Sequence, residues 1–164
     1  MSKKRTKNRK PLRLDVDFTE PFWLIGIQSE LEVFELVYHI NLLSHSKFKR
    51  TNQDILLENS DCGWPLYQWQ QFENSKPEYI FSNWFESIET HSTKSYGLLK
   101  DFETPWMKKV FLLTEFNQMD YFVKLYINHR VELLVEKIHE IGGVSLHLVI
   151  SHEQVKTPEI LIFD

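Results

Sequence analysis

Two acidic side chains, Glu115 and Asp120, lie five residues apart between an apolar run and a run rich in aromatic residues. Two carboxylates that meet in a dry place push one pKa upward, which is how paired acids become an acid and a base. The pair could also bind a hard cation, although calcium takes six to eight oxygens and the local sequence supplies few others. Acids in turns more often accept hydrogen bonds from free backbone N–H groups. We therefore favour a turn over a reaction site.

Two further polar residues have a structural interpretation. Tyr121 would follow the alternation of a strand, where a tyrosine more often packs its ring and hydrogen-bonds its hydroxyl locally than donates a proton. Asn41 lies close to the apolar stripe of a predicted helix, and a polar side chain near a core face usually satisfies a nearby backbone group. We expect both residues to stabilise the fold.

Hydrophobic periodicity indicates the elements that position these residues. Residues 12–18 alternate apolar and charged side chains, which predicts a half-buried strand, and residues 22–27 continue it or form a second, more buried strand. Ser29 and Glu32 stand at the spacing of a capping box, with Ser29 as the N-cap. Apolar residues at three- and four-residue spacing follow, so we expect a helix that ends near Ser44.

The middle of the chain predicts strands. Residues 65–73 and 78–88 are rich in aromatic residues and are separated by turn-forming residues, so they predict a hairpin. Residues 86–106 mix polar and apolar side chains, and we interpret them as a surface insertion that carries at most a short turn of helix. Residues 108–113 and 119–127 predict another hairpin, whose turn holds the two acids.

The last third predicts a helix and a strand. Residues 130–141 place apolar side chains on one helical face and end at two glycines, as helices commonly do. Residues 144–151 predict the last strong strand, because Val144, Leu146, Leu148 and Ile150 alternate and would face inward. The segment after Pro158 forms a short edge strand or packs down. This order suits an α+β two-layer sandwich. We expect an antiparallel sheet of about five to six strands with two helices on one face, in a ferredoxin-like order with an extra hairpin.

Composition supports one compact domain. Of the 164 residues, 42% are hydrophobic, and five Trp, six Tyr and twelve Phe are enough for one core. Six of the nineteen Lys and Arg lie in residues 1–10, so the other 154 residues carry 13 basic and 23 acidic residues, a net charge of −10. We expect residues 1–10 to be a disordered basic arm and residues 11–164 to form a single α+β domain, with residues 86–106 as its surface insertion.

Several classes of protein find no support in the sequence. The longest apolar runs fall short of the roughly 18 residues that a transmembrane helix needs, and the N-terminus lacks a signal-peptide pattern, so we expect a cytoplasmic protein without membrane contact. Cys62 is the single cysteine and the seven His form no ligand pattern, which predicts no metal site and no cofactor. Glycine-rich phosphate loops and the serine-hydrolase elbow are also missing from the sequence.

The acids belong to a longer motif. Glu, Asp and Tyr recur here at the spacing of the sequence IPExxxVDY, while Leu, Thr and Met replace its Ile, Pro and Val. The motif positions are Leu113, Thr114, Glu115, Met119, Asp120 and Tyr121. The chain therefore resembles the IPExxxVDY family, an uncharacterised family found mainly in Bacteroidetes-type bacteria.

The resemblance covers most of residues 12–164. It includes Asn41 late in the first predicted helix and the pair Ser82 and Asn83, which we take as possible binding residues. The family implies the order of elements, with residues 86–106 as an insertion relative to its usual compact form. It implies no activity, cofactor or partner.

We therefore expect a small cytosolic binding or regulatory protein, non-enzymatic, that acts through protein or small-ligand contacts. A homodimer through a sheet edge or a helix face is expected, because exposed sheet edges must be paired, covered or charged. An RNA-binding accessory factor using the basic arm and the aromatic strands is the alternative, but nucleic acid is not favoured because the residues around those aromatics lack positive charge. An enzyme that uses Glu115 and Asp120 is the weakest hypothesis.

Overall fold

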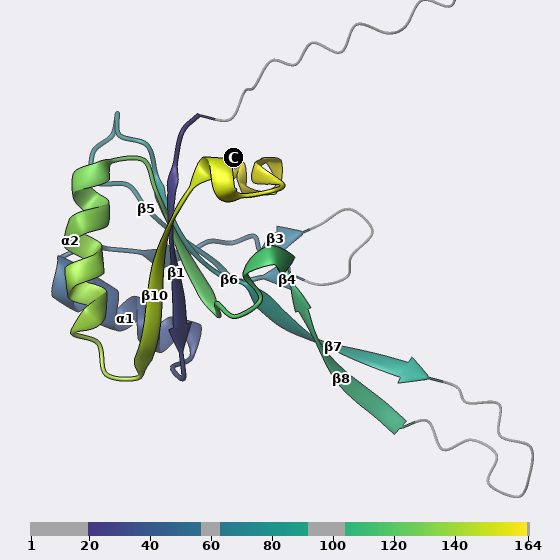
Figure 1. Ribbon diagram of the computed structural model, residues 1–164. Helices are drawn as coiled ribbons and strands as arrows, with labels where there is room; N and C mark the ends of the chain where they lie inside the picture. The colour runs from purple at the N-terminus through teal and green to yellow at the C-terminus, as the bar shows by residue number, and fades with distance from the viewer. Residues whose placement is uncertain (1–19, 57–62, 92–103, 164) are drawn as a thin grey trace, which may run out of the picture.

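The computed structural model describes residues 20–56, 63–91 and 104–163 (Figure 1). The predicted basic arm and the predicted strand at residues 12–18 lie outside the described residues, as does Cys62. Within the described ranges, the helices are too short and too polar to cross a membrane.

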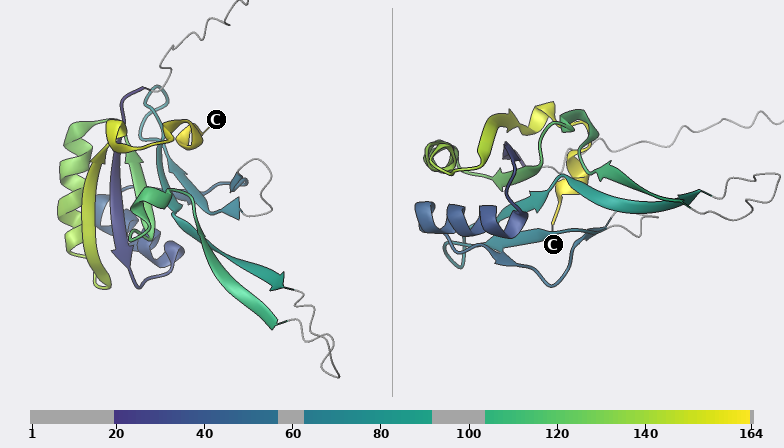
Figure 2. Two further views of the ribbon diagram at one scale, coloured as in Figure 1. Left: turned by 45° about the vertical axis from the view of Figure 1, so that its right-hand side comes forward. Right: turned by 90° about the horizontal axis from the view of Figure 1, so that it is seen from below.

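A six-stranded antiparallel sheet forms the centre of the molecule (Figure 1). Its strands, in order across the sheet, are β10 (Val144–Ser151), β1 (Trp23–Ser29), β9 (Tyr121–Leu125), β6 (Glu78–Ser82), β5 (Leu66–Trp69) and β2 (Lys49–Arg50). Helices α1 (Val33–Ser44) and α2 (Asn128–His139) pack on one face of the sheet (Figure 2). Strands β1, β6, β9 and β10 with the two helices follow the β-α-β-β-α-β order of a ferredoxin-like fold. The expected α+β sandwich is confirmed.

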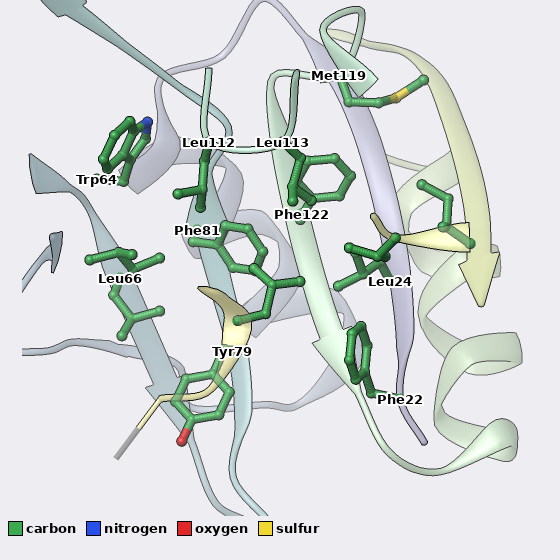
Figure 3. Close-up of a cluster of buried hydrophobic side chains, with 14 residues drawn as sticks. Phe22, Leu24, Trp64, Leu66, Tyr79, Phe81, Leu112, Leu113, Met119 and Phe122 are labelled. Carbon is green, nitrogen blue, oxygen red and sulfur yellow. The ribbon is translucent and has the colours of Figure 1, made fainter. Parts of the chain in front are cut away.

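The sheet is covered on both faces, because successive side chains of a strand point to opposite sides. In β1, Ile25 and Ile27 belong to the core beneath the helices, while Leu24 belongs to a second core on the opposite face. This second core lies under the C-terminal turns η2 (His152–Gln154) and η3 (Pro158–Leu161). Figure 3 shows its side chains. The long apolar run at the start of the described chain thus fits a strand that is buried on both sides.

Helix α1 begins later than the sequence predicts. We expected Ser29 as the N-cap, but Glu32 is the N-cap and forms a capping box with Glu35. Ser29 is still the last residue of β1, which pairs with Val144 across the sheet. Its hydroxyl donates to the carbonyl of Gly143 and accepts from the N–H of Leu31. Strand pairing therefore takes precedence over the local cap signal, while the helix ends at Ser44 as expected.

The predicted hairpin across the two acids is wrong. Strand β8 (Thr104–Phe111) pairs with β7 (Trp84–His91), and β9 pairs instead with β6 and β1. The chain leaves the sheet at Asn83, runs out along β7 and returns along β8, and the β7–β8 pair projects from the body (Figure 1). Part of the segment expected to be an irregular excursion is therefore regular strand. Its status as an insertion stays a prediction.

The remaining elements follow the expected pattern with smaller differences. Strands β5 and β6 form the predicted aromatic hairpin, and the segment after Pro158 packs down as η3. A short strand pair, β3 (Ile55–Leu56) with β4 (Gly63–Trp64), lies in the region expected to be a connection. We expected the alternating leucines of β10 to face the core, but Leu146 and Leu148 are exposed because β10 is an edge strand beyond the covering turns.

Candidate functional site

The buried side chain of Asn83, between β6 and β7, organises the motif. Its Nδ2 donates to the carbonyls of Phe116 and Met119, each at 2.9 Å, and its Oδ1 accepts from the N–H of Leu113 at 2.8 Å. Its backbone N–H donates to the carbonyl of Asp120 at 2.7 Å. One amide side chain thus satisfies several backbone groups that a turn would otherwise leave unpaired.

The motif turn, which we define as residues 112–120, contains the short turn η1 (Thr114–Phe116). Leu113 and Met119 are buried, and Thr114 is exposed. Met119 lies over Gly26 of β1, where an added Cβ would meet its side chain at 2.9 Å. Figure 3 shows Leu113 and Met119 pointing into the second core. The apolar motif positions therefore seal the turn against the sheet.

Asp120 joins three segments of the chain. Its Oδ2 accepts from the N–H of Ser29 at 3.0 Å and its Oδ1 accepts from the Nε1–H of Trp84 at 3.1 Å. Its own N–H donates to the carbonyl of Ile27 at 2.9 Å. The carboxylate therefore ties the end of β1 to the base of the β7–β8 pair.

Glu115 serves a different segment. Its Oε1 accepts from the N–H of Lys156 at 2.9 Å, which fixes the C-terminal turns beside η1. Across the described ranges, no hydrogen bond joins the carboxylates of Glu115 and Asp120, and no group of three His, Cys, Asp or Glu is placed to hold a metal ion. Both carboxylates accept from backbone N–H groups, as expected, but these groups belong to other segments and not to the turn itself.

Tyr121 fixes the connection that leads into α1. Its hydroxyl donates to the carbonyl of Leu31 at 2.7 Å. Burial, aided by the carboxylates of Glu32 and Asp120, raises the pKa of Tyr121 to about 12. At neutral pH the hydroxyl therefore keeps its proton and remains a hydrogen-bond donor.

The possible binding residues have their polar side-chain atoms engaged inside the chain. Asn41 exchanges two bonds with Phe48, donating to its carbonyl at 3.0 Å and accepting from its N–H at 2.8 Å. Ser82 donates from its hydroxyl to the carbonyl of Trp84 at 2.8 Å. Asn41 thus closes the loop after α1, as the structural interpretation of that residue expects.

A buried lysine, Lys124 in β9, was missed by the sequence reasoning. Its side chain is 4% exposed and its Nζ donates to the carbonyl of Leu161 at 2.6 Å. The rings of Phe22 and Tyr126 lie 4.8 and 5.0 Å from the ammonium, and the rings of Phe163 and Tyr79 also lie around it. The only signal in the sequence is a lysine within an apolar strand.

The buried environment of Lys124 disfavours the charged form of its side chain. Burial lowers the pKa of Lys124 to about 8, although the Glu20 carboxylate acts in the opposite direction. A small hollow of about 180 Å³ adjoins the side chain and is walled in part by Phe22 and Phe163. Because the ammonium bonds to the carbonyl of Leu161, its visible role is to hold the C-terminal turns on the sheet.

A second buried charge anchors α2. Arg130 donates from Nε and Nη2 to the two carboxylate oxygens of Glu78 at 3.0 and 2.9 Å, and its Nη2 also reaches the hydroxyl of Ser46 at 3.0 Å. Its guanidinium lies 4.8 Å from the ring of Trp69. Such a paired and stacked arginine is satisfied within the fold and is not free to bind a ligand.

The outer face of α1 has the opposite character. Phe34, Tyr38 and Leu42 recur at four-residue spacing and are 61, 63 and 58% exposed. We call these three residues the α1 stripe. The opposite face buries Leu36 and Ile40, as the sequence predicts. The helix therefore carries apolar side chains on two faces, of which one is buried and the other exposed.

The aromatic strands do not form an exposed platform. Tyr79 and Phe81 of β6 are buried, and Tyr67 and Trp69 of β5 pack partly against the core beneath the helices. Tyr79 and Phe81 therefore belong to the core, whereas Tyr67, Trp69 and Trp84 are half-buried. A cation lies over each of these three rings, namely Arg50, Arg130 and Lys109, so the expectation that positive charge is missing around the aromatic strands is wrong.

The fold is an α+β two-layer sandwich, and the polar motif residues hold separate segments of the chain together by hydrogen bonds. Comparison of the chain with protein-family models, curated proteins and solved structures gave no match.

Proposed function

We propose that this chain is a small, cytoplasmic, non-enzymatic binding protein of the bacterial IPExxxVDY family, and that a second copy of the chain binds to its α1 stripe. The family assignment rests on the spacing of Glu115, Asp120 and Tyr121. Their contacts support it, because each of the three fixes a different neighbouring segment, as residues of a structural signature do.

The observation that carries the binding proposal is the exposure of three large apolar side chains in one row. Single exposed apolar residues are ordinary, whereas the largest contiguous apolar patch of a monomer, typically about 300–600 Å², is often functional. An aromatic side chain buries roughly 150–250 Å² when fully covered. Covering the exposed parts of Phe34, Tyr38 and Leu42 would thus remove roughly 300 Å² from water on each copy.

This area suits the apolar centre of a dimer interface. Standard interfaces bury about 800 Å² per partner and combine an apolar centre with a polar rim. The stripe follows the four-residue ridge of a helix, and two such ridges interdigitate at a crossing angle near −50° in the commonest helix packing. A two-fold axis through Tyr38 would place the same ridge on both sides, which is the self-complementarity that a symmetric dimer needs.

The contacts of the two motif acids support a non-enzymatic role. A working acid and base would share a proton or a substrate, but Asp120 bonds to Ser29 and Trp84 while Glu115 bonds to Lys156. Their oxygens are used to hold backbone and indole groups in place. We therefore assign both residues to the fold.

The test is the native mass of the full chain at micromolar concentration, measured by light scattering after gel filtration. We expect twice the chain mass for the wild type and a single chain mass for Tyr38→Glu, because the substitution brings two carboxylates together at the two-fold axis. Phe72→Glu is the matched control, since Phe72 is 66% exposed but lies outside α1. A monomeric wild type, or a dimer that survives Tyr38→Glu, contradicts the proposal.

A further inference from the structure

A groove beside β2 and β5 has the charge of an anion site. Its volume is about 540 Å³, within the usual range for small-ligand sites. Lys47, Lys49 and Arg50 line it, together with the polar side chains of Asn52 and Gln68, and no carboxylate lines it. Residues 11–164 carry a net charge of −10, so a groove walled by three cations stands out from the rest of the chain.

Two of the three cations are available to a ligand. Arg50 forms an ion pair with Asp54 and also donates to the carbonyl of Leu66 at 3.3 Å, which fixes its position. Lys47 and Lys49 are exposed, and within the part of the chain that the structure describes neither has a carboxylate partner. Two unpaired ammonium groups beside a fixed guanidinium would neutralise a ligand with two or more negative charges.

The wall behind these cations is rigid. The Trp69 ring lines the groove and is held between Phe48, whose ring centroid is 5.7 Å away, and the guanidinium of Arg130. Arg130 is itself neutralised by Glu78. Because Trp69 and Arg50 are held by the fold, a ligand would order mainly the two lysine side chains on binding.

The space for the rest of a ligand lies next to the cations. A larger hollow of about 940 Å³ shares Thr51, Asn52 and Gln68 with the groove. Its lining combines apolar side chains, such as Ile55 and Ile162, with the carboxylates of Asp54 and Glu159. A ligand with its charge in the groove could therefore place an uncharged part in this neighbouring hollow. The side-chain amides at the boundary offer hydrogen bonds to such a part.

We propose that the groove binds the phosphate groups of a small phosphorylated ligand, about the size of a nucleoside diphosphate. Phosphate carries about two negative charges per terminal group and several strong acceptor oxygens, which match the two free ammonium groups and the amides. This site is independent of the proposed dimer, since the α1 stripe contributes none of its residues.

The experiment is a calorimetric titration of the full chain with inorganic pyrophosphate at low salt. We expect saturable binding at one site per chain and at least tenfold weaker binding by the double variant Lys47→Gln/Lys49→Gln. The control is Lys156→Gln, because Lys156 is also exposed but lies outside the groove. Thermal unfolding of each variant confirms that it is folded, and each single lysine substitution provides a milder variant.

Three results of the pyrophosphate titration would overturn the proposal. They are no saturable heat with pyrophosphate, equal affinity in the double variant, and an equal loss of affinity in Lys156→Gln, which would show a general effect of charge. A single-stranded oligonucleotide serves as the competing probe. If it bound far more tightly than pyrophosphate or ADP through the same lysines, with steep salt dependence, the groove would be a nucleic-acid surface instead.

Discussion

The motif turn and the α1 stripe differ in how their side chains are satisfied. At the motif turn, Asp120 and two residues that adjoin the turn, Asn83 and Tyr121, each bond to backbone or side-chain groups of the same chain. In the stripe, Tyr38 and its neighbours turn large apolar surfaces to solvent. Internal satisfaction indicates a role in the fold, whereas apolar exposure in a row indicates a partner.

The comparison also shows that a sequence motif need not mark the binding surface of a protein. Glu115 and Asp120 suggest chemistry because both are acids at close spacing, yet the fold directs them to different segments. The exposed row on α1 forms no motif at all. Substitutions in the two regions should therefore change different measured quantities.

The largest effect on stability is expected for Asn83→Ala. The substitution leaves the N–H of Leu113 and the carbonyls of Phe116 and Met119 without their buried partner. Each orphaned buried group costs about 1–3 kcal/mol, so we expect a loss of about 3–5 kcal/mol in the free energy of unfolding. Urea unfolding measures it.

Asn41→Ala is the control for Asn83→Ala, since it removes an amide that pairs with Phe48 in a half-buried loop. We expect a loss nearer about 1 kcal/mol, because water can reach the freed groups. A loss for Asn83→Ala as small as that of Asn41→Ala would argue against Asn83 as the organiser of the turn.

The second largest effect on stability is expected at the two acids, whose substitution should lower the free energy of unfolding by different amounts. Asp120→Ala frees the N–H of Ser29 and the indole of Trp84, and we expect a loss of about 2 kcal/mol. Glu115→Ala frees only the exposed N–H of Lys156, and we expect a loss below about 1 kcal/mol. Equal losses in chemical unfolding would contradict separate roles for the two carboxylates.

Part of the fold could be predicted from the sequence. Alternation in β10 and helical spacing in α1 predict elements that the structure contains. In α1 the spacing also marks the buried face, whereas in β10 Leu146 and Leu148 are exposed. The cap at Glu32 and the pairing of β8 with β7 depend on distant partners, namely Val144 and Asn83, which local patterns do not encode.

The same limit applies to the candidate site. A structural role for Asp120 and for Asn41 follows from residue type and position, and both side chains bond to backbone groups of the fold. Lys124 could not be placed, because the rings of Phe22, Tyr79 and Phe163 and the carbonyl of Leu161 meet around it only in the fold. The groove at Lys47 and Lys49 likewise needs β5 beside it.

A smaller effect on the free energy of unfolding is expected when the pH is raised. Burial lowers the pKa of Lys124 from 10.5 to about 8, so between these values the folded chain binds fewer protons than the unfolded chain. The contribution of Lys124 to the free energy of unfolding therefore rises with pH from about 8 to 10. Thermal unfolding across this window should show the rise in the wild type and lose it in Lys124→Met.

Above pH 10 the free energy of unfolding should fall as the pH rises. The pKa values of Tyr121 and Tyr126 are raised by burial to about 12, so ionisation of these residues favours the unfolded chain there. A rise between pH 8 and 10 that is equal in the wild type and in Lys124→Met would assign it to another group.

The smallest effect on stability is expected for the stripe. Leu42→Gln changes a side chain that is 58% exposed, and we expect the stability of a single chain to change by no more than about 0.5 kcal/mol. Its association should nevertheless weaken, because the apolar centre of the interface loses area. Sedimentation equilibrium measures the association, and an unchanged dimer constant would contradict this prediction.

Hydroxyl-radical labelling of the full chain, compared between submicromolar and high micromolar concentration by mass spectrometry, tests the central claim most directly. The account predicts that labelling of Phe34 and Tyr38 falls as concentration rises, while labelling of exposed Phe72 stays constant. Unchanged labelling of Phe34 and Tyr38, or protection confined to Phe72, would contradict it.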